Sequence, residues 1–338
     1  MTESSRRLVL AQRPQGMVDE QVCRMETGPV PEPADGEAVV RVRWLSIDPT
    51  IRTWMDDAPG YLPPIELGAV VRCGALGEVI ATRSDRYPLG ATVFGMMGWQ
   101  DHAIVDSAAA TAQVVPDGVD PTAALSIFGV TGMTAYFGLL DIGRPQEGDT
   151  VVVSGAAGAT GSVVGQIAKA KGAGTVVGIA GGPEKCAWIV DELGFDAAID
   201  YKADDVPARL RTLCPDGIDV YFDNVGGVIL DACLANLALR ARVVLCGAIS
   251  AYNDRGSAHG LSNYTSLIAR RARMEGFLVL DYIDRFAEGQ GEMLGWVLEG
   301  KVKHAVHVVE GLADAPDALN LLFTGGNTGK VIVKVDGP

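Results

Sequence analysis

Hydrophobic residues follow two rhythms along this chain. Between residues 150 and 300, short β-branched runs alternate with stretches in which apolar residues recur every three or four positions. Buried parallel strands read as continuous apolar runs and surface helices as one-sided stripes, so this alternation predicts a doubly wound α/β sheet. The expected strands are residues 151–153, 175–179, 197–199, 218–223, 242–246 and 274–279, and the expected helices are a segment from Ser162 that Gly172 ends, and residues 183–193, 206–213, 228–237 and 266–271.

The first 125 residues follow the other rhythm. They are rich in valine, proline and turn residues and poor in helical periodicity, which predicts a β-rich domain with strands at 38–44, 67–79 and 91–94. A helical stretch from Pro121 to residue 143 follows. Residues 304–310 and 330–335 read as strands that return to the β-rich part. The expected domains are therefore residues 1–125 with 301–338, and residues 126–300.

A glycine-rich turn joins the first strand of the α/β part to its first helix. Ala156, Gly158 and Gly161 have the A-x-G-x-x-G spacing. Without side chains at the two glycines the backbone can approach a pyrophosphate, which the N–H groups at the start of the helix would face. An ordinary tight turn in a chain with 42 glycines is the alternative. The place of the turn between a strand and a helix favours a Rossmann dinucleotide-binding site.

The end of the second strand indicates which dinucleotide would bind. NAD sites usually carry an acidic residue about 20 positions beyond the glycines, where it binds the ribose 2′-hydroxyl. Gly181 and Gly182 stand there in this chain, and Lys185 follows at the start of the next helix. Lys185 is either a partner for a 2′-phosphate or a solvated surface lysine. Because no carboxylate would repel the phosphate, the sequence favours NADP over NAD.

Composition narrows the class of protein further. The 338 residues are enough for two hydrophobic cores, and no apolar run is long enough to span a membrane. A formal charge of −14 argues against nucleic acid as a partner. Residues 1–10 lack the apolar core of a secretory signal, which predicts a cytosolic, or cytoplasmic, protein. The six cysteines are scattered without a C-x-x-C pair, as is typical of reduced thiols.

Reduction next to a carbonyl group needs something to hold the developing negative oxygen: a metal, a phenol, an imidazole or backbone amides. A zinc site is not expected, because the β-rich part contains only Cys23, Cys73 and His102, without a close Cys/His pair. His304 and His307 are three apart and would face opposite sides of a strand. Hydroxyl groups are therefore the better candidates.

A set of short motifs spread over nearly the whole chain resembles one family. The motifs are LSIDPTIR, AAGATGSVVGQIAK, GGPEKC, FDAAIDYK, YFDNVGG, CGAIS-x-YN, MEGFLV and GGNTGK. They resemble the zinc-free medium-chain reductases, specifically the leukotriene 12-hydroxydehydrogenase/15-oxoprostaglandin 13-reductase group, which includes plant alkenal double-bond reductases and bacterial curcumin reductases. One segment departs from the family. Members usually have Tyr after Asp-Pro and then Met-Arg, whereas this chain has Thr50, Ile51 and Arg52.

The resemblance implies a Rossmann domain with a β-rich GroES-like domain, a homodimer, and NADPH as the cofactor for reducing the C=C bond of α,β-unsaturated ketones or aldehydes. It also implies where the cofactor binds. Gly158 and Gly161 would hold the pyrophosphate, and Lys185 and Tyr201 the 2′-phosphate. The ribose and nicotinamide would contact Asn224, Cys246, Phe277 and Asn327, and the remaining implied cofactor contacts are Ala157, Thr160, Ile249, Ser250, Tyr252 and Val279.

Two tyrosines are the implied catalytic residues. Tyr252, in a loop expected at residues 249–261, would donate a hydrogen bond to the substrate oxygen, and Tyr61 of the β-rich domain would be a second donor. A phenol has a pKa of about 10, so it stays protonated at neutral pH and can donate a hydrogen bond. The alternatives are a loop tyrosine that covers the cofactor and an aromatic residue at the rim. Cys246 is expected to be a small packed residue rather than a nucleophile.

Two other functions stay open at this point. A quinone reductase of the zeta-crystallin type would share the cofactor site but prefer quinones. A protein that binds NADPH without turnover would show binding and no oxidation. The presence of both Tyr61 and Tyr252 favours an enzyme, and a small-molecule enone or enal is the expected partner.

Overall fold

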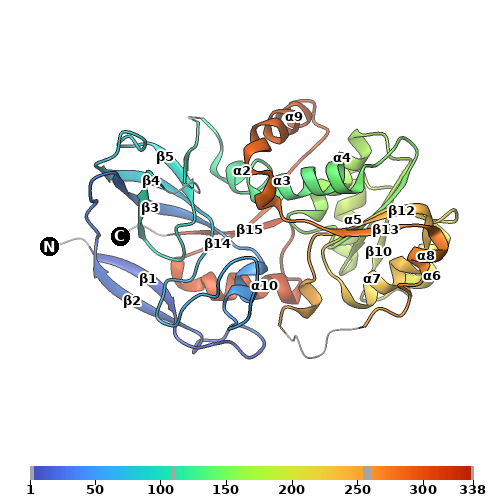
Figure 1. Ribbon diagram of the computed structural model, residues 1–338, viewed down its shortest axis with the longest axis horizontal. Coiled ribbons are helices and arrows are strands. Elements are labelled where there is room, and N and C mark those ends of the chain that lie inside the picture. Colours follow the sequence, from blue (N-terminus) through green and yellow to red (C-terminus); the bar gives the residue numbers. More distant parts are fainter. Residues whose placement is uncertain (1–3, 109–111, 117, 254–259, 336–338) are drawn as a thin grey trace. The chain divides into compact units, whose positions relative to one another are not determined.

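The computed structural model describes residues 4–108, 112–116, 118–253 and 260–335 (Figure 1). The chain divides into two units. The first comprises Met1–Leu125, Val306–Asn327 and Val331–Pro338, and the second comprises Ser126–Ala305 and Thr328–Lys330. No helix within the described ranges is both long and apolar enough to cross a bilayer.

The second unit is built on a parallel sheet. Its strands stand in the order β10-β9-β8-β11-β12-β13, and the chain moves outward from β8 on one side before it returns to start β11 on the other. This is the Rossmann order, which confirms the predicted fold class, and its ligand crevice lies where the order reverses. The strands are β8 (Thr150–Ser154), β9 (Thr175–Ala180), β10 (Ala197–Asp200), β11 (Ile218–Asp223), β12 (Leu237–Leu245) and β13 (Arg273–Gly276).

Helices connect these strands. Apolar side chains from the sheet, such as Val152, Val177 and Tyr221, pack with helical residues such as Leu210 and Leu230 in one buried cluster. The helical elements of this unit are α3 (Val130–Phe137), the π-helical turn η1 (Gly138–Gly143), α4 (Gly161–Ala170), α5 (Pro183–Asp191), α6 (Val206–Leu213), α7 (Gly227–Leu234), η2 (Ile249–Ala251), α8 (Ser266–Arg270), η4 (Val279–Arg285) and α9 (Phe286–Leu298).

Three expected boundaries in this unit are wrong. The helix expected at 228–237 ends at Leu234, because Leu237 already pairs with Ile218 and starts β12 five residues earlier than expected. The strand expected at 274–279 ends at Gly276, and a 3₁₀ helix begins at Val279. The helical stretch expected from Pro121 to residue 143 is interrupted before α3 by the extended backbone of Gly129.

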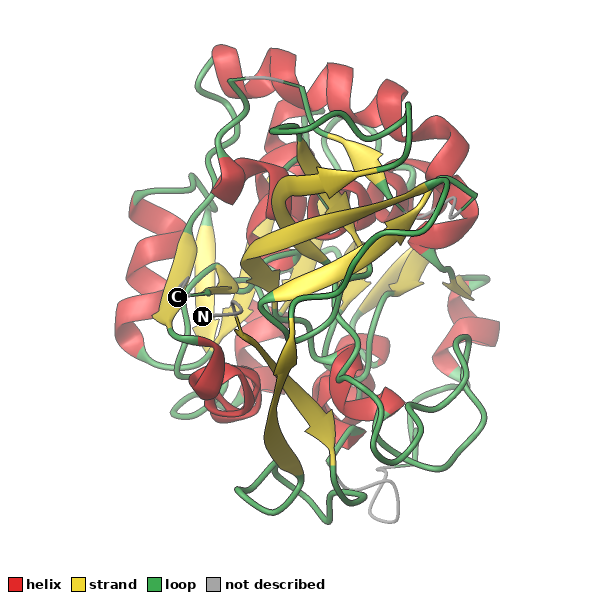
Figure 2. Cartoon of the chain, turned by 90° about the vertical axis from the view of Figure 1, so that its left-hand side faces the viewer, coloured by secondary structure: helices red, strands yellow, loops and turns green. Residues whose placement is uncertain are grey.

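The first unit contains the β-rich sheet, whose strands are drawn in yellow in Figure 2. Its order is β14-β15-β3-β4-β5-β7, β6 pairs with β3, and β1 and β2 form a separate antiparallel pair. The elements are β1 (Ser4–Leu10), β2 (Cys23–Pro29), β3 (Glu37–Ser46), α1 (Thr50–Trp54), β4 (Ala75–Thr82), β5 (Thr92–Gly95), β6 (His102–Asp106), β7 (Gln113–Val114), α2 (Pro121–Leu125), β14 (Val306–Glu310), η5 (Leu312–Asp314), α10 (Ala315–Thr324) and β15 (Lys330–Lys334).

The return of the chain's end to this sheet is confirmed. β15 runs antiparallel to β3, with Ile332 opposite Ser46. The strand expected at 67–79 is wrong in its first part, because the regular strand β4 starts only at Ala75. β14 starts at Val306, so His307 lies in the strand and His304 precedes it. The two histidines therefore do not share a strand, and the expectation that they face opposite sides of one strand is wrong.

Candidate cofactor and active site

The glycine turn between β8 and α4 has no room for larger residues. The N–H of Gly158 donates to the carbonyl oxygen of Gly155 at 2.9 Å, which closes the turn. A Cβ at position 161 would collide with that same carbonyl. Ala156 fits its place because the facing residue, Gly178, also lacks a side chain: a Cβ there would lie 2.9 Å from the Cβ of Ala156. The backbone of this turn is thus left uncovered by its own side chains, as a pyrophosphate would require.

A segment distant in the sequence forms a backbone hydrogen bond with this turn. The N–H of Gly329, in the segment Thr328–Lys330, donates to the carbonyl oxygen of Ala157 at 2.8 Å. Asn327, one of the expected cofactor contacts, is buried in the first unit directly before this segment. Asn327 is therefore two residues along the chain from Gly329, which forms the backbone hydrogen bond with the glycine turn.

Positive side chains gather at the ends of β9 and β10. The register of the two strands sets Ala180 opposite Asp200, so Gly181 on one strand end and Tyr201 and Lys202 on the other lie at the same edge of the sheet. A Cβ at position 181 would lie 3.0 Å from Cε of Lys202. Burial lowers the pKa of Lys185, and the positive charge of Lys202 lowers it further. The charge of Lys202 thus disfavours the charge of Lys185, and a phosphate dianion bound at this loop would offset that repulsion.

Tyr201 also lies beside Gly181. Its ring carbon Cε1 would be 2.8 Å from a Cβ at position 181, so the glycine makes space for the ring. A carboxylate does reach this loop, from the next strand: Asp200 Oδ1 accepts the N–H groups of Gly182 at 2.8 Å and Lys202 at 3.0 Å. These backbone bonds fold the loop that carries Tyr201 and Lys202. Sequence analysis had not selected Lys202, although it ends the FDAAIDYK motif.

The carboxylate of Asp223 organises the crevice between β8 and β11. It is fully buried and accepts four different donors: the hydroxyl groups of Ser154 (2.8 Å) and Tyr221 (2.7 Å), and the N–H groups of Val225 (3.1 Å) and Gly226 (3.0 Å). Its carbonyl oxygen also accepts the N–H groups that follow β12. This residue fixes the two strand ends and the turn after β11. From the sequence, Asp223 was expected only as the end of a strand and as part of the motif YFDNVGG.

Asn224 follows directly and is held at the same edge. Its side-chain amide donates to the carbonyl oxygen of Ser154 at 2.7 Å, and its N–H donates to the Ser154 hydroxyl at 2.9 Å. Its own carbonyl oxygen accepts the N–H of Ile249 at 3.3 Å. Ser250 is tied to Val225 through its hydroxyl, at 2.6 Å. The structure therefore brings Asn224, Ile249 and Ser250, three of the implied cofactor contacts, together at this edge.

Cys246 stands at the end of β12, where its N–H donates to the carbonyl oxygen of Asp223 at 2.9 Å. Burial raises the pKa of its thiol to about 12, and the negative charge of Asp223 adds to this effect. The thiol is therefore protonated at neutral pH. This state agrees with a packed residue and argues against a nucleophile.

Tyr252 reaches back over the end of β12. Its hydroxyl oxygen accepts the N–H of Ala248 at 3.1 Å and would lie 3.3 Å from a Cβ at position 247, so a side chain there would crowd the phenol. The phenol is thus at the carboxyl edge of the parallel sheet, where ligands of this fold bind. Within the loop expected at 249–261, residues 254–259 lie outside the described residues.

Phe277 and Val279 follow β13 at this edge. The ring of Phe277 packs edge-to-face on Phe222, with centroids 6.5 Å apart, and fills the space that Gly138 leaves by having no side chain. Val279 is buried.

Tyr61 belongs to the first unit. Its ring packs edge-to-face on Trp54, with centroids 6.2 Å apart, and it is 44% exposed. Burial raises the pKa of its phenol and hydrogen bonds with Thr50 and Trp54 oppose this increase. Thr50, the residue at which the chain departs from the family pattern, is therefore a neighbour of the expected second tyrosine.

No cluster of three or more His, Cys, Asp or Glu side chains that could hold a metal ion occurs in the part of the chain that the structure describes.

Comparisons with known proteins show which proteins this chain resembles. A family model described as the N-terminal domain of oxidoreductase matches residues 6–114, and one described as zinc-binding dehydrogenase matches residues 159–294. The chain is 40% identical to the NADPH-dependent curcumin reductase of Escherichia coli, over 99% of this chain and 98% of that one. It is 39% identical to the NADP(+)-dependent 2-alkenal reductase of Nicotiana tabacum, over 90% and 89%. Its structure matches that of CurA from Vibrio vulnificus in complex with NADPH, with a TM-score of 0.93 and 41% identity over 98% of this chain and 100% of that chain.

Proposed function

We infer the reaction of this chain from the family to which it belongs, the zinc-free medium-chain dehydrogenase/reductases. The protein is an oxidoreductase that uses NADPH to reduce the C=C bond of α,β-unsaturated ketones and aldehydes. The observation that carries the cofactor assignment is that Lys202 lies beside Gly181 and that its positive charge lowers the pKa of Lys185, at the start of the next helix. A 2′-phosphate is the part of NADPH that NADH lacks, and this pair suits it. The substrate class rests on the kinship with curcumin and alkenal reductases.

Residues along the carboxyl edge of the sheet would bind different parts of NADPH. Gly158 and Gly161 let the pyrophosphate approach the start of α4, and Lys185 with Tyr201 and Lys202 holds the 2′-phosphate. The other cofactor contacts, at Ala157, Thr160, Asn224, Cys246, Ile249, Ser250, Phe277, Val279 and Asn327, remain our proposal. NADPH, when bound, supplies the hydride that the substrate's β-carbon accepts.

Tyr252 is proposed as the catalytic hydrogen-bond donor. Its oxygen accepts the N–H of Ala248, which orients the phenol, and its O–H would donate to the substrate oxygen as the enolate develops. The α-carbon then takes a proton from water. Tyr61, which contacts Thr50, is proposed to contact the substrate from the first unit.

A substrate panel tests the proposed reaction. With purified protein and NADPH, 3-nonen-2-one should be reduced to the saturated ketone, and NADPH should not be consumed with the saturated ketone as substrate. Consumption with 1,4-benzoquinone only would identify a quinone reductase of the zeta-crystallin type. Tight NADPH binding without oxidation across the panel would identify a binding protein. Either result contradicts the proposal.

The Tyr252→Phe variant should lower kcat/KM for 3-nonen-2-one by about 100-fold, because an oxyanion donor is lost, while the Kd for NADPH changes less than about threefold. Steady-state kinetics and a fluorescence titration measure the two quantities. Tyr264→Phe, at an exposed tyrosine of the same unit, is the matched control. An unchanged kcat/KM with weaker NADPH binding would instead mean that Tyr252 only covers the cofactor.

Two predictions remain to be tested. The family resemblance implies a homodimer, and the sequence suggests a cytoplasmic location. Light scattering of the purified protein and cell fractionation would test them.

A further inference from the structure

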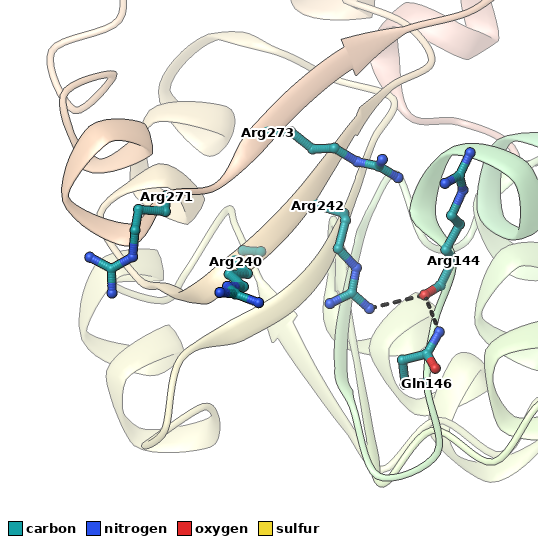
Figure 3. A pocket seen from close by; sticks show the side chains of 7 residues that line it. Arg144, Gln146, Arg240, Arg242, Arg271 and Arg273 are labelled. Carbon is teal, nitrogen blue, oxygen red and sulfur yellow. Dashed lines mark hydrogen bonds between the residues drawn. The ribbon is translucent and has the colours of Figure 1, made fainter.

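Arginine side chains gather around a second pocket in the Rossmann unit. An open cavity of about 430 Å³ is lined by Gln146, Ala241 and five arginines: Arg144, Arg240, Arg242, Arg271 and Arg273. Figure 3 shows Arg240 and Arg242 on one strand, Arg273 on the neighbouring strand, and Arg144 with Gln146 on a separate segment. In a chain with a net charge of −14, such a concentration of positive charge is unexpected.

This pocket is distinct from the cofactor crevice. Arg273 is the first residue of β13, and Gln146 lies in the loop that leads into β8. Because the strands are parallel, their amino ends meet at one edge of the sheet and their carboxyl ends at the other. Asp223 and Cys246 lie at the carboxyl edge, so the arginine pocket opens at the opposite side of the strands.

Three of these arginines have unusual backbones. Within the described residues, the non-glycine residues with a left-handed φ are Arg144 (48°), Arg240 (63°) and Arg271 (52°). Arg144 ends η1, Arg271 ends α8, and Arg240 lies where the pairing of β12 with β11 shifts register. Glycine is the residue that such positions usually favour. All three left-handed positions thus lie among the residues that line this pocket.

The charges of the pocket are only partly neutralised. Arg242 forms an ion pair with Asp149, and Arg273 has Glu275 at 4.0 Å. Arg144 donates to the carbonyl oxygen of Asp141 at 2.8 Å and Arg271 to that of Ala269 at 3.5 Å. Among the residues that the structure describes, Arg144, Arg240 and Arg271 therefore have no carboxylate partner, and the pocket keeps an excess of positive charge.

We propose that this pocket binds a linear polyphosphate, either an inorganic chain or the phosphates of a nucleotide. Guanidinium groups bind phosphate oxygens in pairs of parallel hydrogen bonds, and several guanidinium groups around one cavity match several linked phosphates better than one monovalent anion. The exposed Arg144, Arg240 and Arg271 supply the unpaired charge. Arg242 and Arg273 donate to the carbonyl oxygens of Gly143 and Ile142, and these hydrogen bonds hold their side chains in place in the pocket lining.

Calorimetric titration of sodium tripolyphosphate tests the site, with the protein saturated with NADP⁺ so that the cofactor crevice is filled. We expect one tripolyphosphate per chain, bound at least tenfold more tightly than sulfate. The variant Arg240→Gly/Arg271→Gly should bind tripolyphosphate at least tenfold more weakly, with unchanged enone reduction and an unchanged or higher Tm, since glycine relaxes both left-handed positions. The variant Arg24→Gln/Arg83→Gln removes the same charge from exposed positions of the first unit and should bind as the natural chain does.

Titration with ATP distinguishes the two sources. Tighter binding of ATP than of tripolyphosphate points to a nucleotide, and equal affinity points to the inorganic chain. The proposal is overturned if the natural chain does not bind tripolyphosphate, or if both double variants lose the same affinity. It is also overturned if Arg240→Gly/Arg271→Gly changes the oligomeric mass in light scattering and leaves tripolyphosphate binding intact, because the arginines then belong to an interface with a second copy.

Discussion

Replacing both Lys185 and Lys202 by alanine should raise the KM for NADPH by about 100-fold and leave the KM for NADH within about threefold. A charge-assisted hydrogen bond to phosphate contributes about 1.5 kcal/mol or more, and two such losses correspond to roughly this factor. Steady-state kinetics with 3-nonen-2-one and each cofactor measures the change. Lys169→Ala removes a lysine of the same unit that pairs with Asp196, and it should leave both values unchanged.

The same pair predicts a pH dependence. Burial and the charge of Lys202 lower the pKa of Lys185, so Lys185 is protonated below that pKa and loses its charge as the pH rises through it. The affinity for NADPH should therefore fall with rising pH before the affinity for NADH changes. In Lys202→Ala the pKa of Lys185 rises, and the decline should move to higher pH. If the pH profiles for NADPH and NADH coincide, Lys185 does not contact the 2′-phosphate.

Replacing Asp223 by alanine should lower the free energy of unfolding by about 4 kcal/mol and abolish NADPH binding. Four donors, from Ser154, Tyr221, Val225 and Gly226, would lose their buried acceptor, each at a cost of about 1 kcal/mol or more. Urea unfolding followed by circular dichroism measures the change.

Asp205→Ala is the control for this stability effect. Asp205 caps α6 through a single hydrogen bond to Ala208 and is exposed, so its loss should lower the free energy of unfolding by only about 1 kcal/mol. A loss at Asp223 no greater than this would show that the buried network does not hold the crevice together.

The fold was largely predictable from the sequence. α6 and β11 have the predicted bounds, because each is a strong local pattern: an N-capped amphipathic segment in one case and a buried apolar run in the other. α9 was missed because Gly289, Gly291 and Gly295 weaken its helical pattern.

Reasoning from the residues alone indicated site positions only where they stand near one another along the chain. The glycine turn and Lys185 belong to one strand–turn–helix–strand–helix segment and were selected there. Lys202 becomes a neighbour of Lys185 only through the pairing of β9 with β10. Asp223 meets Ser154 across 69 residues of chain. Contacts of this kind depend on strand order and register, which a single sequence does not display.

The most direct test of the account follows the hydride itself. NADPH labelled with deuterium at the transferable position of the nicotinamide is oxidised with 3-nonen-2-one, and the product is analysed by nuclear magnetic resonance. We predict a saturated ketone that carries one deuterium on the β-carbon, with none on the carbonyl carbon. An allylic alcohol with deuterium on the carbonyl carbon would contradict the account, as would a saturated ketone without label.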